Sequence, residues 1–332
     1  MQTPRTGSIM NRSSIQLRRN GITLIEMVVV LAIIGMLCSI LIPAVQRVRE
    51  TARRVGCQSN LRQIGVGVAD YESLYGVLPN GMPLHFTLLP FLGMSDIYSR
   101  YDPTVPSARR EPAYDGVRHI KIPLYLCPSE YVDPTQKWSW GGTVTGSSYP
   151  ACYGSGLVAS NFTFDGAFGV WDMTYSGPPC QPLRLSDITD GTSNVAALSE
   201  WLIGGLEKRR LRAVWETPRV YGPLQVDVYR DLCEFLPVDP ASLGWSGIEF
   251  HGFPWYSGSP GLGQYNHMLP PNRPSCLNGV GIITGIHTAG SMHAGGVHLL
   301  FVDGHLEFQS ENIDRRVWQR LGGRNNDAAG VN

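Results

Sequence analysis

The chain has 332 residues, enough for one or two domains with a sizeable core. Lys plus Arg number 27, as do Asp plus Glu, so the formal net charge is zero and no basic field indicates a nucleic-acid partner. A hydrophobic content of 43% excludes a disordered chain, and 38 Gly with 24 Pro indicate many turns and irregular loops.

A basic stretch followed by an apolar one opens the chain. Residues 22–42 contain one charged side chain, Glu26, and as a helix would be about 32 Å long, which matches a bilayer hydrocarbon core of about 30 Å. A cleaved secretory signal would have a shorter apolar core and a small-residue cleavage site after it. We therefore expect the segment to be retained as a single membrane span. Four arginines precede it: Arg5, Arg12, Arg18 and Arg19.

The junction between the two stretches reads Gly21-Ile22-Thr23-Leu24-Ile25-Glu26. This segment resembles the processing motif of type IV prepilins and type II secretion pseudopilins. The resemblance implies that a prepilin peptidase cuts after Gly21 and methylates the new amine of Ile22, although the usual first residue is Phe or Met. Glu26 and Pro43 then match the family's assembly positions.

Orientation follows from the same resemblance, because the arginines on the two sides of the span nearly balance. It implies a single-pass protein of the cytoplasmic (inner) membrane. The N-terminus would be cytoplasmic and the head periplasmic or extracellular.

Glu26 is the unusual residue of the apolar segment. A carboxylate in lipid costs about 2.5–3.5 kcal/mol on insertion scales, but the first turn of a helix favours a negative charge. Cleavage at Gly21 would create a positive amine one turn away. In a filament, Glu26 would pair with that amine on a neighbouring subunit. The alternative is that Glu26 only reaches to the lipid–water interface.

The helix is predicted to continue past Pro43 to about Tyr75. Apolar residues recur at steps of three or four positions, which is typical of an amphipathic helix. Gly76 and Pro79 then end it. The recurring residues are Leu61, Ile64, Val68, Tyr71 and Tyr75.

Four later segments of the chain carry recognisable motifs. They are residues 57–65 beginning Cys57-Gln58-Ser59-Asn60, Leu126-Cys127-Pro128-Ser129, residues 187–194 followed by Glu200, and residues 293–304 beginning His293-Ala294-Gly295-Gly296. Together they resemble the DUF1559 family, pilin-like proteins of unknown function, with Glu130 in place of an Asp as one departure. The resemblance covers roughly residues 20–322 with a variable middle, and it implies an exported head on a prepilin-type anchor without a known activity.

Cys38 lies in the apolar run, and the other six cysteines of the chain would form up to three disulfides in an exported head. Unpaired buried thiols are the alternative. The family resemblance implies a Cys57–Cys127 disulfide as the first candidate.

A β-hairpin is predicted near the C-terminus, with Asp303-Gly304 as a two-residue turn. This register pairs Phe301 with Leu306 and Leu299 with Phe308 on a core face. It places His298 and Leu300 on the opposite face.

Two groups of side chains suggest metal ligands. Asp187, Asp190 and Asn194 offer the hard oxygens that Ca²⁺ prefers, but such residues more often bond their own backbone in turns, and we favour the turn. Four histidines cluster at positions 287, 293, 298 and 305. In the predicted hairpin His298 and His305 are too far apart for one ion. His293 is expected to bond a backbone carbonyl, so no cofactor or transition metal is expected.

Neither catalysis nor ligand binding has a strong signature. Ser246 lies in a Gly-rich segment that falls short of a hydrolase nucleophile elbow, so no enzyme is predicted. The main alternative is a binding protein on the same anchor, in which aromatic side chains of the loops would stack on carbohydrate. We favour a role of these aromatic side chains in the core of the head. These aromatics are Trp138, Trp140, Tyr149, Tyr153, Trp171, Tyr175, Trp245, Trp255 and Tyr256.

The predicted fold is α+β and pilin-like, with a long N-terminal helix packed on an antiparallel sheet. Its parts are a leader (1–21), a helix (22–75), a head (76–323) and a disordered tail (324–332). The predicted function is a non-catalytic structural or surface protein. Its partners would be prepilin peptidase, the bilayer and other pilin-like subunits, with no nucleic acid.

Overall fold

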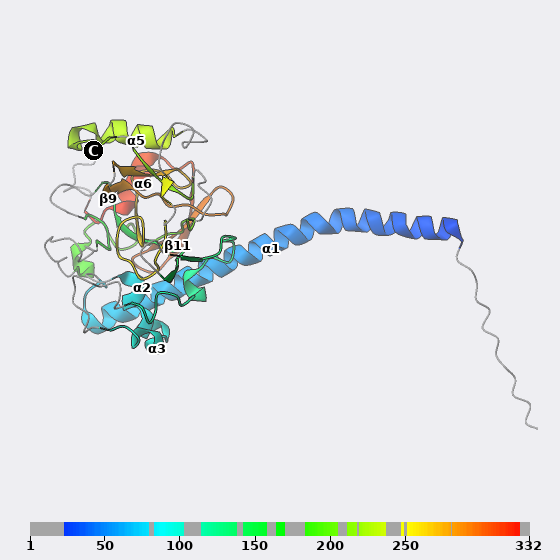
Figure 1. Cartoon of the computed structure of the whole chain (residues 1–332), viewed down its shortest axis with the longest axis horizontal. Coiled ribbons are helices and arrows are strands. Elements are labelled where there is room, and N and C mark those ends of the chain that lie inside the picture. Colours follow the sequence, from blue (N-terminus) through cyan, green and yellow to red (C-terminus); the bar gives the residue numbers. More distant parts are fainter. Residues whose placement is uncertain are drawn as a thin grey trace, which may run out of the picture. The chain divides into compact units, whose positions relative to one another are not determined.

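A long helix, α1 (Leu24–Tyr75), begins the described part of the chain and continues through Pro43 (Figure 1). In the computed structural model, internal contacts divide the chain into two units, 1–49 and 50–332, with the boundary inside α1. The predicted leader and Ile22 lie outside the described residues. The structure describes residues 23–79, 83–102, 114–137, 142–157, 164–169, 183–204, 211–217, 219–236, 247–248, 251–279 and 281–325.

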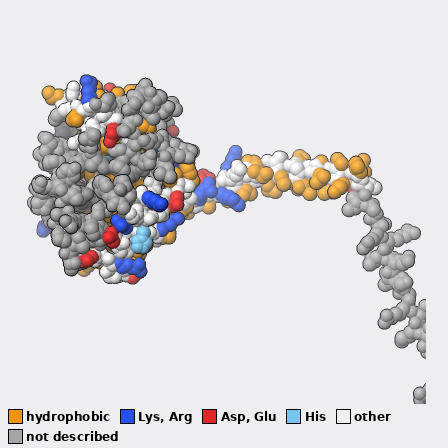
Figure 2. All heavy atoms as spheres, in the orientation of Figure 1, with side chains coloured by type: hydrophobic (Ala, Val, Ile, Leu, Met, Phe, Trp, Pro, Cys, Tyr) orange, Lys and Arg blue, Asp and Glu red, His pale blue; other side chains and the backbone are white. Residues whose placement is uncertain are grey.

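The N-terminal part of α1 has the properties of a membrane anchor. It is long and apolar enough to cross a bilayer. Its most apolar stretch of 18 residues has a mean hydropathy of 2.9, and none of these residues is buried. Its large side chains are exposed, including Leu24 at 82% and Met36 at 69%. Figure 2 shows this part of the helix covered with hydrophobic side chains. Such a surface is stable only against lipid or other apolar helices.

The second unit contains three sheets among its described residues. The first is an antiparallel pair of β1 and β2. The second has the order β11-β10-β4-β3-β7, and the third has the order β6-β5-β8-β9. The strands are β1 (Thr135–Lys137), β2 (Thr143–Thr145), β3 (Ala151–Gly154), β4 (Ala196–Leu198), β5 (Val214–Glu216), β6 (Gly247–Ile248), β7 (Gln264–Asn266), β8 (Ser275–Asn278), β9 (Gly281–Ile286), β10 (Gly296–Phe301) and β11 (Leu306–Ser310).

The predicted α+β, pilin-like class is confirmed. Most strand pairs are antiparallel, but β3 pairs with β7 and β5 with β8 in parallel. Short helices fill the connections. They are α2 (Leu84–Thr87), η1 (Leu89–Leu92), α3 (Ser95–Tyr98), η3 (Pro123–Tyr125), η4 (Leu185–Asp187), η5 (Pro223–Gln225), α5 (Val226–Glu234) and α6 (Arg315–Gly322).

The second half of α1 forms part of the core of the second unit. Cys57, Leu61, Ile64 and Val68 are buried at helical spacing, whereas Tyr75 is 58% exposed. Gly65 allows α1 to pass close to β10, because a Cβ there would stand 3.1 Å from the Leu300 side chain. The apolar stripe predicted from the sequence is therefore buried over most of its length, in a core cluster that includes Leu300 of β10 and, at the junction of two short helices, Leu88 and Leu89.

The hairpin of β10 and β11 differs from its prediction by one residue. Leu300 pairs with Leu306, and His298 pairs with Phe308. The turn has three residues rather than two, and its last residue, Gly304, has a φ of 90°. A slip of one residue exchanges the two faces of a strand. His298 and Leu300 consequently share their face with Leu306 and Phe308, and β10 is buried on both faces.

Polar contacts fix the start of α6 and the end of the described chain. Asp314 caps α6 by accepting hydrogen bonds from the backbone N–H groups of Arg316 and Val317. Arg324, which the sequence placed in a disordered tail, donates to the carbonyl oxygens of Phe164 and Gly166, both at 2.7 Å. The rest of the predicted tail, 326–332, lies outside the described residues.

Truncation of α1 tests this packing. Leu61→Ala should lower the free energy of unfolding of the second unit by about 2–5 kcal/mol, because the fully buried side chain leaves a cavity. Leu74→Ala is the matched control on the same helix, since Leu74 is 66% exposed. Urea unfolding of the full chain in detergent, followed by tryptophan fluorescence, measures both. Equal midpoints for the two variants would contradict the packing.

Candidate functional sites

The N-terminus of α1 is closed by a reciprocal capping box. The backbone N–H and the hydroxyl of Thr23 both donate to Glu26 Oε2 at 2.8 Å, and the Glu26 N–H donates to Thr23 Oγ1 at 3.4 Å. This Thr-x-x-Glu arrangement satisfies donors that the first turn of a helix leaves free. Glu26 thus has a local structural role that the sequence interpretation did not consider.

The structure describes only some of the other residues that the sequence analysis singled out in and before the apolar helix. Gly21 and Ile22 lie outside the described residues, so the structure does not test them as processing positions. Pro43 lies inside α1, and Cys38 is an exposed free cysteine.

Two disulfides join the described cysteines of the second unit. Cys57 is bonded to Cys127, the pair implied by the family resemblance, and Cys233 to Cys276. Cys152 is free and fully buried, and burial raises the pKa of its thiol above the ordinary range. Cys180 lies outside the described residues.

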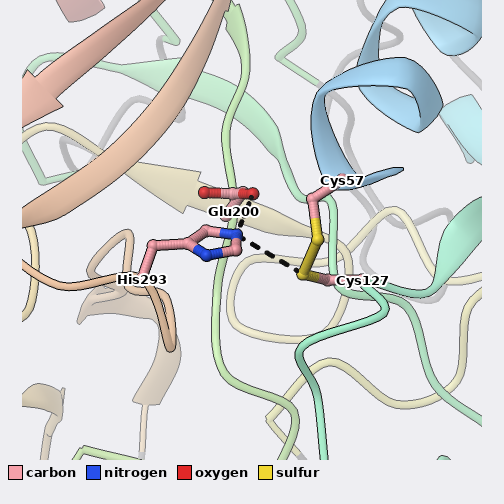
Figure 3. A group of neighbouring side chains, drawn as sticks. All are labelled: Cys57, Cys127, Glu200 and His293. Carbon is pink, nitrogen blue, oxygen red and sulfur yellow. Dashed lines mark hydrogen bonds and ion pairs between the residues drawn. A yellow bond between two sulfur atoms is a disulfide. The ribbon is translucent and has the colours of Figure 1, made fainter. Parts of the chain in front are cut away.

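The first disulfide lies beside a buried acid and histidine. Cys57 comes from α1, Cys127 from the loop after η3, Glu200 from the segment after β4, and His293 from the loop before β10 (Figure 3). Their potential ligand atoms all lie within 4.8 Å of one another. Each residue belongs to a different one of the four segments that carry the family resemblance, so distant parts of the sequence converge on this cluster.

Glu200 is the centre of the polar contacts. Its Oε1 lies 3.4 Å from His293 Nε2, and its Oε2 lies 3.1 Å from His298 Nδ1. The backbone N–H of His298 also donates to Oε2 at 2.9 Å. Burial acts to raise the pKa of Glu200, but the bonds and charge of the two histidines outweigh it and lower the pKa. Glu200 is therefore a buried carboxylate held by two imidazoles.

His293 lies between two carboxylates. Its Nδ1 is 3.1 Å from Glu50 Oε1, and its Nε2 faces Glu200. Burial acts to lower the pKa of His293, yet the bonds and charges of Glu200 and Glu50 raise it. The prediction that His293 bonds a backbone carbonyl is wrong, because both ring nitrogens face acids from other elements.

His298 connects Glu200 to α1. Arg54 Nε and Gln58 Nε2 both donate to His298 Nε2, at 3.1 and 2.8 Å. A nitrogen that accepts cannot carry the proton, so the neutral ring holds it on Nδ1 and donates to Glu200. The Arg54 guanidinium also lies 4.0 Å from the centre of the Phe308 ring. These contacts bind α1 to both strands of the hairpin.

Two cavities adjoin the disulfide. A surface cavity of about 290 Å³ is lined by Cys127, Pro128 and Glu130 among others. A second one, of about 10 Å³, is lined by both Cys127 and Glu200 and has room for about one water molecule. The cluster is therefore close to solvent on its Cys127 side.

The other predicted ligands do not belong to this cluster. Asp187 Oδ2 accepts from the Arg184 N–H at 2.9 Å, and Asn194 Nδ2 donates to the Asp190 carbonyl at 2.9 Å. These are local bonds of the kind that we favoured, and calcium binding stays the alternative. His287 is buried, and the exposed His305 lies 2.6 Å from Asp303. Ser246 lies outside the described residues.

The aromatic residues considered for ligand binding divide into two sets. Tyr149, Tyr153, Trp255 and Tyr256 are at most 3% exposed, which places these four in the core. The other five lie outside the described residues, so carbohydrate binding stays the alternative.

The convergence of Glu200 and His293 on the disulfide was not predicted from the sequence. The two-residue turn put His298 on the wrong face, and Glu200 was noted only as part of a family segment. One feature of the sequence could have indicated the cluster. Each of the four family segments contributes one potential metal ligand: Cys57, Cys127, Glu200 and His293.

The apolar helix and the N-terminal motif define a prepilin-like, membrane-anchored protein. The model of the prokaryotic N-terminal methylation motif matches residues 17–42, and this motif implies processing by prepilin peptidase. The chain belongs to the family described as "Protein of unknown function (DUF1559)", whose model matches residues 46–316. Comparisons with curated proteins and with solved structures gave no match.

Replacement of Glu200 tests the buried network. Glu200→Gln should lower the free energy of unfolding by about 3 kcal/mol, because it removes the charge between two buried histidines and leaves a donor against the His298 N–H. Glu307→Gln, at an exposed position of β11, should change it by less than about 0.5 kcal/mol. Chemical unfolding at constant pH measures both, and a neutral Glu200→Gln variant would contradict the network.

Proposed function

We propose that the chain is a structural subunit of a pilin- or pseudopilin-like assembly, or a surface protein that uses the same processing route, and that it has no catalytic role. The observation that carries the proposal is the Thr23–Glu26 capping box at the start of an exposed apolar helix. Prepilin peptidase would cut after Gly21, leaving the new amine of Ile22 next to that box.

The capping box leaves Glu26 able to make a second bond. Both Thr23 donors use Oε2, and among the described residues no hydrogen bond is made to Oε1. In an assembly this oxygen would accept from the Ile22 amine of a neighbouring subunit, where lipid would strengthen the attraction. The exposed apolar surface of α1 would pack on the same neighbour.

Location follows from the same processing route. The N-terminus would face the cytoplasm, α1 would cross the cytoplasmic membrane, and the second unit would lie outside it. An oxidising compartment is consistent with two disulfides among the described cysteines. Prepilin peptidase, the bilayer and other pilin-like subunits would be the partners.

Mass spectrometry of the N-terminus tests the processing step. The protein extracted from membranes should begin at Ile22 with a methylated amine, and Gly21→Leu should prevent cleavage. Recovery of wild-type protein from the soluble fraction with residues 1–21 attached would contradict the proposal.

Substitution of Glu26 separates assembly from anchoring. Glu26→Leu should still be cleaved and remain in the membrane, but should lose at least about 90% of crosslinking between subunits, because the amine has no partner. Asp70→Leu, an exposed acid on the same helix, is the control and should crosslink as wild type does. Undiminished crosslinking of Glu26→Leu would favour a monomeric surface protein, such as a ligand-binding protein on the same anchor.

A further inference from the structure

We propose that Cys57, Cys127, His293 and Glu200 form a zinc site when the Cys57–Cys127 disulfide is reduced. The disulfide and the metal-bound dithiolate would be two mutually exclusive states of one cluster. Zinc prefers thiolate and imidazole ligands in four-coordinate tetrahedral sites and accepts a carboxylate, which is the donor set that these residues supply.

The distances in the cluster fit such a site. Ligands at about 2.0–2.3 Å from a tetrahedral Zn²⁺ lie about 3.3–3.8 Å from one another. His293 Nε2 lies 3.4 Å from Glu200 Oε1 and 3.8 Å from Cys127 Sγ. The imidazole thus already has the spacing of a zinc ligand from both the carboxylate and one sulfur, and all four ligand atoms lie within 4.8 Å of one another. Figure 3 shows how these side chains are oriented.

The sulfur atoms must move for the metal to bind. Sulfurs in a disulfide are about 2.05 Å apart, whereas two thiolates on zinc are about 3.8 Å apart. Separation by about 1.7 Å requires rotation of the cysteine side chains after the bond is broken. The cavity of about 10 Å³ lined by Cys127 and Glu200 gives room next to the ligands, and the larger surface cavity reaches Cys127 from outside.

Residues around the four ligands hold them in the required orientation. His293 Nδ1 is directed at Glu50, so the Nδ1–H would be donated to a carboxylate while Nε2 binds the metal. A carboxylate–histidine–zinc arrangement of this kind fixes the ring and its tautomer. Glu200 is oriented in turn by the ring and backbone N–H groups of His298.

Reduction of the full chain in detergent by a water-soluble phosphine tests the site. The phosphine and one water molecule yield two thiols and the phosphine oxide, and each Zn²⁺ bound then releases the two thiol protons. Reduced protein should bind one Zn²⁺ or Co²⁺ per chain at this site, and oxidised protein none. Cobalt bound to both thiolates gives a sulfur-to-metal charge-transfer band and tetrahedral d–d bands.

Variants identify the ligands. Cys57→Ser/Cys127→Ser should lose the charge-transfer band, and His293→Gln should weaken metal binding by more than about 100-fold. Glu50→Gln, which only orients His293, should weaken it about 10–100-fold. Cys233→Ser/Cys276→Ser removes the second disulfide and should bind one metal like wild type.

A further variant avoids the risk that reduction unfolds the second unit. Cys57→Ala breaks the disulfide without a reductant and leaves Cys127, His293 and Glu200, so it should bind one Co²⁺ with a thiolate band that Cys57→Ala/His293→Gln lacks. Near-ultraviolet circular dichroism confirms the fold of each variant. The proposal is overturned if folded Cys57→Ala and reduced wild type both bind no metal, or if the band survives His293→Gln.

Discussion

A buried carboxylate without partners would be too costly to keep, and the arrangement around Glu200 follows from that constraint. The cost of burial is offset because His293 and His298 lie against its two oxygens and a backbone N–H donates to one of them. His298 in turn needs donors for its other nitrogen, and Arg54 and Gln58 of α1 supply them. One charge therefore fixes the relation between the β-sheet and the second half of α1.

The disulfide and this polar network act on the same helix at adjacent turns. Cys57 is bonded to the loop that contains Cys127, Arg54 contacts His298 one turn earlier, and Glu50 contacts His293 two turns earlier. Covalent closure of a loop of this size would stabilise the fold by about 4 kcal/mol in the chain-entropy model. The apolar stripe then continues the contact from Leu61 onward. Covalent, polar and apolar contacts thus follow one another along one face of α1 from Glu50 onward, and all of them lie within the second unit.

Sequence patterns predicted the helix, the fold class and the first disulfide, because these depend on local periodicity or on a family motif. The prediction of the hairpin faces failed because it depended on the length of the turn, and a difference of one residue there exchanges the two faces. The Asp303-Gly304 signal fits both a two-residue and a three-residue turn, and the difference moves His298 from one face to the other. Glu200 carries no local signal, since its role depends on strands separated by about a hundred residues.

Two acids of α1 have different environments. Glu26 is exposed at the start of the apolar segment, and Thr23 donates to its Oε2. Glu50 lies near the middle of the helix, and its oxygens are used by Arg53, Ser129 and His293. In the proposed assembly the first acid would make contacts between chains, because among the described residues no hydrogen bond is made to its Oε1. The second is committed to its own chain, so its substitution should change the head and leave processing of the N-terminus intact.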